Sequence, residues 1–255
     1  MNDFGSVGGS YREYCSSVRG RLRHDIVFAD LSKCLKERAS ILDVGCGDGE
    51  MSLRLARAGH AVLGIDPSPG MLEIAHMRLE KEPVEVAGRM TFSQGDLFTL
   101  DLNDEFDCVC CHGVLMYLPE SRSALTKLAT LARSRGLLSV LTKNAASVGF
   151  REALKRDYVA AKEIISNSFV TTSGNLGIET RGDYPDALVD AFEELDFKNA
   201  SWSGVRIFCD HYPEDEWMPA DAYRDLLSLE QTASRRDPYR QMARLVHVLG
   251  RKVGG

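Results

Sequence analysis

The sequence predicts an α/β fold built on a doubly wound, mostly parallel sheet. Seven short runs rich in valine, isoleucine and leucine alternate, through much of the chain, with amphipathic segments of helical spacing. Buried parallel strands have this continuous apolar character, and a parallel connection needs a crossover that usually contains a helix. A glycine-rich stretch, ILDVGCGDGE at 41–50, also lies where the first strand should pass into a helix.

The predicted elements follow one another in a regular order between residues 40 and 144. Strands and helices are expected to alternate, with two strands in succession after the second helix. In chain order they are strand 40–47, helix 50–59, strand 60–66, helix 69–81, strand 90–96, strand 105–114, helix 121–136 and strand 137–144. This part is the predicted ligand-binding core.

Three further segments flank the core. Residues 1–39 carry a helical pattern and are predicted to form an N-terminal helical cap. Residues 145–182 are polar, with weak helical periodicity, and we interpret them as an inserted lid or substrate-side segment. Residues 183–255 are expected to complete the sheet, with helices near 184–197 and 219–234 and strands near 200–210 and 243–252.

Composition narrows the possible classes of protein. The chain has 255 residues and a net charge of −6, which argues against a strong sequence-independent hold on nucleic acid. It shows neither a membrane-length apolar run nor a secretory signal, so we expect a cytoplasmic protein. The seven cysteines form no disulfide framework. We interpret CVCC at 108–111 as part of a buried strand rather than a metal or redox site, and we expect no metal.

The glycine stretch indicates a ligand site. Gly45, Gly47 and Gly49 lack a Cβ, so a ligand can approach the backbone closely, and the next helix offers free N–H groups. Dinucleotide sites favour G-x-G-x-x-G, whereas this spacing is G-x-G-x-G, which disfavours a nicotinamide-dependent oxidoreductase. Asp43 precedes the glycines, and Asp66 ends the second strand, where it can hold the two hydroxyls of a ribose.

Four ordered motifs, LDVGCGDG, GIDPSPGML, GDL and CHGVLMYLPE, resemble the class I S-adenosylmethionine-dependent methyltransferase family. The resemblance implies a seven-stranded Rossmann-like sheet with an antiparallel C-terminal strand and S-adenosyl-L-methionine as cofactor. It implies that the glycines approach the methionine part of the cofactor and that acidic, apolar and basic side chains hold the rest. These residues are Asp43 for the amino group, Arg23 for the carboxylate, Asp66 for the ribose, Met71, Asp96 and Leu97 around the adenine, and His112 beside the methyl group.

The flanks resemble a narrower family, the bacterial tRNA 5-carboxymethoxyuridine methyltransferases. The similar stretches are RGRLRHDIVFADLSKCL, DYPDALVDAFEELDF, SGVRIFCDHY and RRDPYRQMARLVHVLGRK. The resemblance implies methylation of a carboxylate on a wobble uridine to give a methyl ester. A carboxylate is already a nucleophile at neutral pH, so the site needs a cation to hold it rather than a general base. We predict Arg206 as that cation, with Tyr117, Tyr212 and His112 lining the acceptor side.

Other acceptors and roles stay open at this stage. The segment before the DYP motif lacks the lysine-rich run expected of the tRNA enzymes, and position 116 is methionine where an acid is expected. A small-molecule O- or N-methyltransferase, acting for example on a natural-product acid, is therefore the alternative. A non-catalytic binding subunit with the same fold is a more remote one. The sequence does not determine the acceptor or the oligomeric state.

Overall fold

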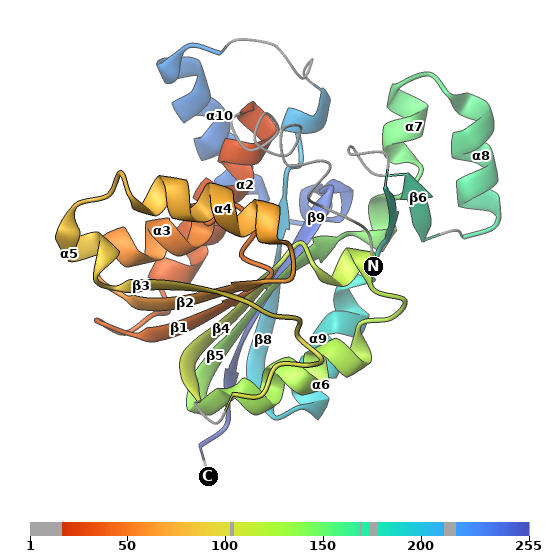
Figure 1. The fold of residues 1–255 in the computed structure, drawn as a ribbon. Helices are drawn as coiled ribbons and strands as arrows, with labels where there is room; N and C mark the ends of the chain where they lie inside the picture. Colours follow the sequence, from red (N-terminus) through yellow and green to blue (C-terminus); the bar gives the residue numbers. More distant parts are fainter. Residues whose placement is uncertain (1–16, 103–104, 169, 174–177, 212–217, 255) are drawn as a thin grey trace.

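A mixed sheet of seven strands, counted over the described residues, organises the fold (Figure 1). The computed structural model describes residues 17–102, 105–168, 170–173, 178–211 and 218–254. The strand order is β3–β2–β1–β4–β5–β9–β8, in which β9 runs antiparallel to both of its neighbours. The prediction of a mostly parallel sheet with an antiparallel C-terminal strand is confirmed. The strands are β1 (Ser40–Val44), β2 (Ala61–Asp66), β3 (Met90–Gln94), β4 (Phe106–His112), β5 (Ala132–Lys143), β8 (Phe197–Val205) and β9 (Leu245–Lys252).

Helices cover both faces of this sheet (Figure 1). One apolar core lies under α2 (Val18–Ser32), α3 (Glu50–Arg57), α4 (Pro69–Leu79) and α10 (Ala220–Ala233). The second core lies under α6 (Arg122–Leu131) and α9 (Pro185–Glu194). A short helix, α5 (Val84–Ala87), precedes β3. The two layers confirm the doubly wound arrangement.

The cysteine run lies in the middle of the sheet, as predicted. Cys108 and Cys110 on β4 face the first core, whereas Val109 and Cys111 face the second. All four side chains are fully buried. Burial raises the pKa of the Cys111 thiol, so this thiol stays protonated and inert.

The predicted helix over 121–136 ends earlier than its sequence pattern suggests. The helix α6 stops at Leu131, and β5 begins at Ala132. Its first residues form an irregular pairing with β4, with a register shift between Phe106 and Cys108 and a left-handed Arg135 at φ 61°. A Cβ on Gly136 would lie 2.8 Å from the carbonyl oxygen of Arg133. The glycine therefore belongs to a bulge in the strand, not to a helix.

Residues 145–182 form a small unit that stands to one side of the layers (Figure 1). It contains η3 (Ala145–Ser147), α7 (Phe150–Leu154), α8 (Tyr158–Ser166) and a hairpin of β6 (Thr171–Ser173) and β7 (Glu179–Arg181). The buried ammonium of Lys143, at the end of β5, donates to Thr172 Oγ1 at 2.7 Å and to the Thr180 carbonyl at 2.8 Å. Burial and the nearby Arg244 lower the pKa of Lys143 to about 7. One strand end thus anchors the hairpin.

The glycine turn after β1 has a left-handed backbone at every second residue. The φ angles of Gly45, Gly47 and Gly49 are 73°, 56° and 77°. A Cβ on Gly45 would lie 2.1 Å from Val114 Cγ2, and one on Gly49 would lie 2.6 Å from Phe92 Cζ. The structure adds a second reason for glycine at these two positions, because the packing of the protein itself leaves no room for a Cβ there.

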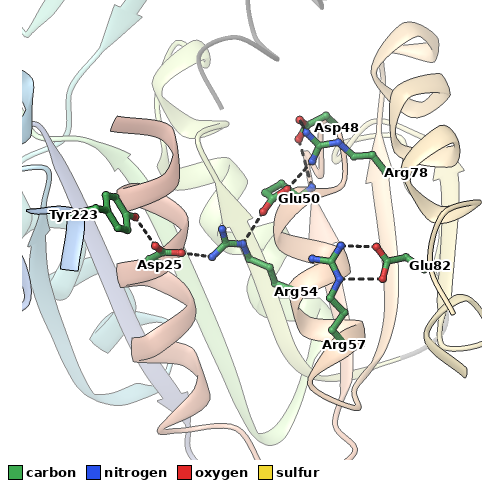
Figure 2. Close-up of polar contacts among 8 residues, drawn as sticks. All are labelled: Asp25, Asp48, Glu50, Arg54, Arg57, Arg78, Glu82 and Tyr223. Atoms are coloured by element: carbon green, nitrogen blue, oxygen red, sulfur yellow. Dashed lines mark hydrogen bonds and ion pairs between the residues drawn. The ribbon is translucent and has the colours of Figure 1, made fainter. Parts of the chain in front are cut away.

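An ion-pair network holds the glycine turn against the helices (Figure 2). Asp48 in the turn is buried, and its Oδ2 lies 2.8 Å from Arg78 Nη2 on α4. Glu50 at the start of α3 accepts from both Arg78 and Arg54, each at 2.7 Å. The network continues from Arg54 to Asp25 on α2 and from there to Tyr223 on α10. Four helices and the glycine turn are thereby connected in one network.

The first prediction concerns Gly49, which should tolerate alanine far less well than Gly59. Both have positive φ, but a Cβ on Gly59 would meet nothing within 4 Å, whereas one on Gly49 would also press on Ala75 at 3.1 Å. Gly59→Ala should cost about 1–2 kcal/mol of unfolding free energy for its backbone alone. Gly49→Ala should cost about 1–3 kcal/mol more for the clash, as measured by urea denaturation. Equal losses in the two variants would contradict the packing argument.

The second prediction compares two arginines of the network. Arg78→Met leaves the carboxylate of Asp48, which is 3% exposed, without its cation, and should lower the unfolding free energy by about 3 kcal/mol. Arg57→Met removes a pair with Glu82 in which the arginine side chain is 49% exposed, and should cost no more than about 1 kcal/mol. Guanidinium chloride would mask ion pairs, so urea is the denaturant of choice. A smaller loss in the Arg78 variant would show that Asp48 does not need this partner.

Candidate active site

The predicted site residues lie mainly at the carboxyl edge of the parallel strands. The order of the sheet reverses between β1 and β4, because β2 lies on one side of β1 and β5 on the far side of β4. Ligands in doubly wound sheets bind outside the strand ends at such a switch point. The glycine turn, His112 and the loop after β4 all lie at this point.

Two buried carboxylates mark the ends of β1 and β2. Asp43 accepts a hydrogen bond from Ser52 Oγ at 2.6 Å. Burial and the charge of Asp66 raise the pKa of Asp43 to about 6. The carboxylate of Asp66 accepts from the backbone N–H groups of Gly47 and Ser68, each at 2.9 Å, yet burial still raises its pKa. Both carboxylates are shielded from water, and a ligand bound here could pair with them through cationic or hydroxyl groups.

Arg23 on α2 faces the same place. Its side chain is buried, and its Nη1 lies 3.7 Å from the position that a Cβ on Gly113 would take. Its charge acts on Asp43, lowering the pKa of that carboxyl against the effect of burial. The structure therefore brings Arg23, Asp43, the glycine turn, Asp66 and His112 together, as predicted.

The three residues predicted around the adenine occupy different settings. Met71 is buried in the first turn of α4, where Ser68 caps the helix. Asp96 accepts the N–H of Phe98 at 2.9 Å, as an acid in a turn commonly does. Leu97 is buried in the second core, together with Val44 and Ile65. All three follow β2 or β3 and so lie on the side of the sheet away from β5.

A chain of hydrogen bonds runs beneath α2 from His112 toward Asp30. The hydroxyl of Ser139 on β5 lies 2.8 Å from Nε2 of His112 and 2.8 Å from Nε2 of His247 on β9. Nδ1 of His247 faces the carboxylate of Asp30 at 3.7 Å, and Ser203 donates to the same oxygen. Burial alone would raise the pKa of Asp30, but the hydrogen bond and charge of His247 hold it well below its usual value.

This chain couples the ring of His112 to that of His247. Ser139 has one hydroxyl proton, so it can donate to only one of the two histidines and must accept from the other. Nδ1 of His112, the other ring nitrogen, is a buried atom with no hydrogen-bond partner among the described residues. Burial, with the charges of His247 and Arg23, lowers the pKa of His112 and keeps it neutral.

Arg206 follows β8 in a left-handed conformation, with φ 66°. The three N–H groups after it, from Ile207 to Cys209, all donate to the buried carboxylate of Glu230 on α10, at 2.8–3.0 Å. The guanidinium of Arg206 is itself 4% exposed and is bound to Asp210 through Nε at 2.7 Å. Arg206 thus lies at the predicted edge, but it is already engaged by a carboxylate of the chain.

Arg206 belongs to a cationic cluster at the end of β5, β8 and β9. We define the cluster by charges that act on one another's pKa values: those of Arg151, Arg206, Arg244 and Lys143. Three carboxylates, those of Asp210, Glu152 and Glu179, act on the same groups. Among these seven side chains the sum of charges is positive when all are ionised. This side of the edge therefore attracts anions.

Of the two predicted tyrosines, Tyr117 belongs to the described residues. Tyr117 lies half-buried in η2 (Leu115–Tyr117), after β4. The loop that follows is held by Arg181, whose Nε donates to the carbonyl oxygen of Leu118 at 3.2 Å and whose Nη1 pairs with Asp183 at 2.7 Å. Tyr212 lies outside the described residues.

Sequence reasoning missed several residues that shape the site. Asp30, Ser139, His247 and Glu230 each lie within a predicted helix or strand, where a polar side chain usually faces solvent. The available signal was a polar residue interrupting an apolar strand, as Ser139 does in LLSVL and His247 in LVHVL. Their partners come from distant parts of the chain, so the sequence could not pair them.

No helix in the described part of the chain has the length and apolar character that crossing a membrane requires. Within the same residues, no three histidine, cysteine, aspartate or glutamate side chains converge as a metal ion would require.

This chain is similar in sequence to a known protein family and to individual known proteins. Residues 42–140 match a family described as a methyltransferase domain. The tRNA 5-carboxymethoxyuridine methyltransferase of Escherichia coli K12 is 27% identical over 250 residues, which cover 94% of this chain and 92% of that protein. A ubiquinone biosynthesis O-methyltransferase of Alkalilimnicola ehrlichii is 36% identical over 126 residues, covering 47% of this chain and 49% of that protein.

Solved structures share the fold from end to end. An S-adenosylmethionine-dependent methyltransferase from Thermotoga maritima aligns with a TM-score of 0.64 at 18% identity, covering 98% of this chain and 97% of that one. The magnesium protoporphyrin IX methyltransferase of Synechocystis, solved with bound S-adenosylhomocysteine, also aligns at 0.64, with 17% identity and 98% and 96% coverage. The strand order, the glycine turn at the switch point and these matches lead to one conclusion: the chain is a class I S-adenosylmethionine-dependent methyltransferase.

Proposed function

We propose that this enzyme methylates a carboxylate to a methyl ester, and that its acceptor is a 5-carboxymethoxyuridine in tRNA or a similar acid. The observation that carries the proposal is the cationic cluster, because it lies next to the switch point, on the side away from Asp43 and Asp66. The likeness to a curated tRNA 5-carboxymethoxyuridine methyltransferase over 94% of the chain supports the tRNA acceptor.

The residues at the β1 and β2 ends fit the chemical groups of the cofactor. Buried carboxylates with raised pKa values suit an ammonium and sugar hydroxyls, and a buried guanidinium suits a carboxylate. Asp43 would hold the amino group, Arg23 the carboxylate and Asp66 the ribose. Met71, Asp96 and Leu97 would border the adenine, the turn of Gly45, Gly47 and Gly49 would support the methionine part, and His112 would lie beside the methyl group.

The acceptor side needs little acid–base chemistry for this reaction. When bound, S-adenosylmethionine supplies an electrophilic methyl group, and a carboxylate accepts it without a proton to remove. The chain therefore has to hold one carboxylate oxygen and leave the other free to react. A guanidinium suits this task because its donors are arranged in a fixed fork. A neutral His112 and a half-buried Tyr117 would border the reacting groups without competing for the methyl group.

The third prediction concerns the pH dependence of cofactor binding. Above about pH 6 Asp43 is ionised and attracts the ammonium of S-adenosylhomocysteine; below this pH the carboxyl is protonated and the attraction is lost. Affinity measured by calorimetry should fall up to about tenfold per pH unit below this value. Asp43→Asn should bind more weakly at neutral pH and lose this dependence.

Asp43→Asn also gives a control for folding. The raised pKa means that the ionised carboxylate costs the ligand-free protein about 3 kcal/mol at neutral pH. The variant should therefore unfold no more easily than the wild type in urea. A large loss of stability together with unchanged affinity would assign Asp43 a structural role only.

The fourth prediction tests the acceptor. Methyl-labelled cofactor is incubated with enzyme and with tRNA from cells that make 5-carboxymethoxyuridine or from cells that cannot make it. Label should enter only the first tRNA, and mild base should release it as methanol, because esters hydrolyse whereas N-methyl and ether groups do not. Mass spectrometry of the nucleosides should then show the methyl ester of 5-carboxymethoxyuridine.

Two results would contradict this assignment. Equal labelling of both tRNA samples, or label stable to base, would exclude the carboxylate of this nucleoside. Absence of label in tRNA, together with methylation of acids in a metabolite extract, would favour the small-molecule alternative instead.

A further inference from the structure

Arg244 has a fixed place in the middle of the acceptor side. It directly precedes β9, and its N–H donates to the carbonyl oxygen of Arg206 at 2.9 Å. On its other side, the N–H of Asn144 donates to the carbonyl oxygen of Arg244 at 3.1 Å. The backbone of Arg244 is therefore held between the ends of β5 and β8.

The guanidinium of Arg244 is the unusual part of this residue. Its side chain is only partly exposed, and it makes no hydrogen bond or ion pair with any residue that the structure describes. Burial, with the charges of Arg206 and Arg151, lowers its pKa. The charges of Asp210 and Glu152 act on Arg244 in the opposite direction, but neither carboxylate is bonded to it, and Oδ1 of Asp210 is bound by Arg206 at 2.6–2.7 Å.

Two other arginines that are only partly exposed do have partners. Arg240 binds Asp237 and stacks on Trp202, and Arg181 binds Asp183. A partly desolvated guanidinium among like charges is unfavourable in the ligand-free protein. A bound anion would offset both the lost solvation and the repulsion. Unfavourable groups of this kind are concentrated at functional sites.

We propose that Arg244, rather than Arg206, binds the carboxylate of the methyl acceptor, with the Arg206–Asp210 pair fixing its position. This inference rests on the proposed function. A carboxylate fits better than a phosphate of the nucleic-acid backbone, because the side chain of Arg244 is only partly exposed. Backbone phosphates would reach exposed cations such as Arg235, which is 58% exposed, more easily.

The variant that tests the inference is Arg244→Gln, which removes the charge of the guanidinium. The matched control is Arg236→Gln, which removes the charge of an exposed arginine nearby in the sequence. In ligand-free protein, Arg244→Gln should melt at the same or a higher temperature than the wild type, because like-charge repulsion is lost. A clear drop in melting temperature would instead assign the arginine a structural role.

The second measurement does not depend on the identity of the acceptor. Protein loaded with S-adenosylhomocysteine, which occupies Arg23, is titrated with acetate and its melting temperature is followed. Acetate should stabilise the wild type and the Arg236 variant more than the Arg244 variant. Equal stabilisation of all three would overturn the anion site, whatever the acceptor is.

The third measurement uses tRNA that carries 5-carboxymethoxyuridine. Arg244→Gln should raise KM for this tRNA at least about tenfold, the effect expected for a lost charge-assisted hydrogen bond, and leave affinity for S-adenosylhomocysteine nearly unchanged. Arg244→Lys should recover part of the loss. An unchanged KM in Arg244→Gln would refute the assignment. If the wild type fails to methylate this tRNA, the proposed function fails, and the acetate titration still decides the anion site.

Discussion

The carboxylate of Asp66 is the constraint on which the cofactor half of the molecule depends. It receives the N–H of Gly47 from the turn after β1 and the N–H of Ser68 from the start of α4. One side chain therefore fixes two consecutive strand ends relative to each other. Burial opposes its ionisation, so the turn is held by a group that is itself short of solvation. A ligand with hydroxyl groups can donate the further hydrogen bonds that this carboxylate lacks.

Charge divides the carboxyl edge into two unlike halves. Carboxylates dominate the ends of β1 and β2, whereas guanidinium and ammonium groups dominate the ends of β5, β8 and β9. Between them lies His112, which burial keeps neutral. In the proposed reaction this division sorts the reactants, since the ammonium of one and the acid of the other are drawn to opposite sides of the reacting centre.

Local patterns predicted the fold well, for physical reasons. Apolar runs and helical spacing report burial directly, and a strand end followed by glycines defines the switch point. Contacts at the ends of β5, β8 and β9 could not be predicted in this way. Arg206 was singled out from its motif, but its partner Asp210, and the lack of a bonded partner for Arg244 among the described residues, became evident only from folded distances. Likewise, Ser139 and His247 are 108 residues apart, and no local pattern links them. The helix α6 was predicted to end too late, because the residues of the bulge that follows it have a sequence pattern similar to that of a helical turn.

The helix α10 touches both halves through two side chains on its inner face. Tyr223 binds Asp25 on α2, the helix that presents Arg23, while Glu230 binds the turn that presents Arg206. The two residues are about two helical turns apart, and an α-helix of that length is a stiff rod. In the proposed reaction, α10 would thus keep a constant distance between the residues proposed to hold the methyl donor and the turn beside the proposed acceptor site. Such a spacer would help to align the three reacting atoms.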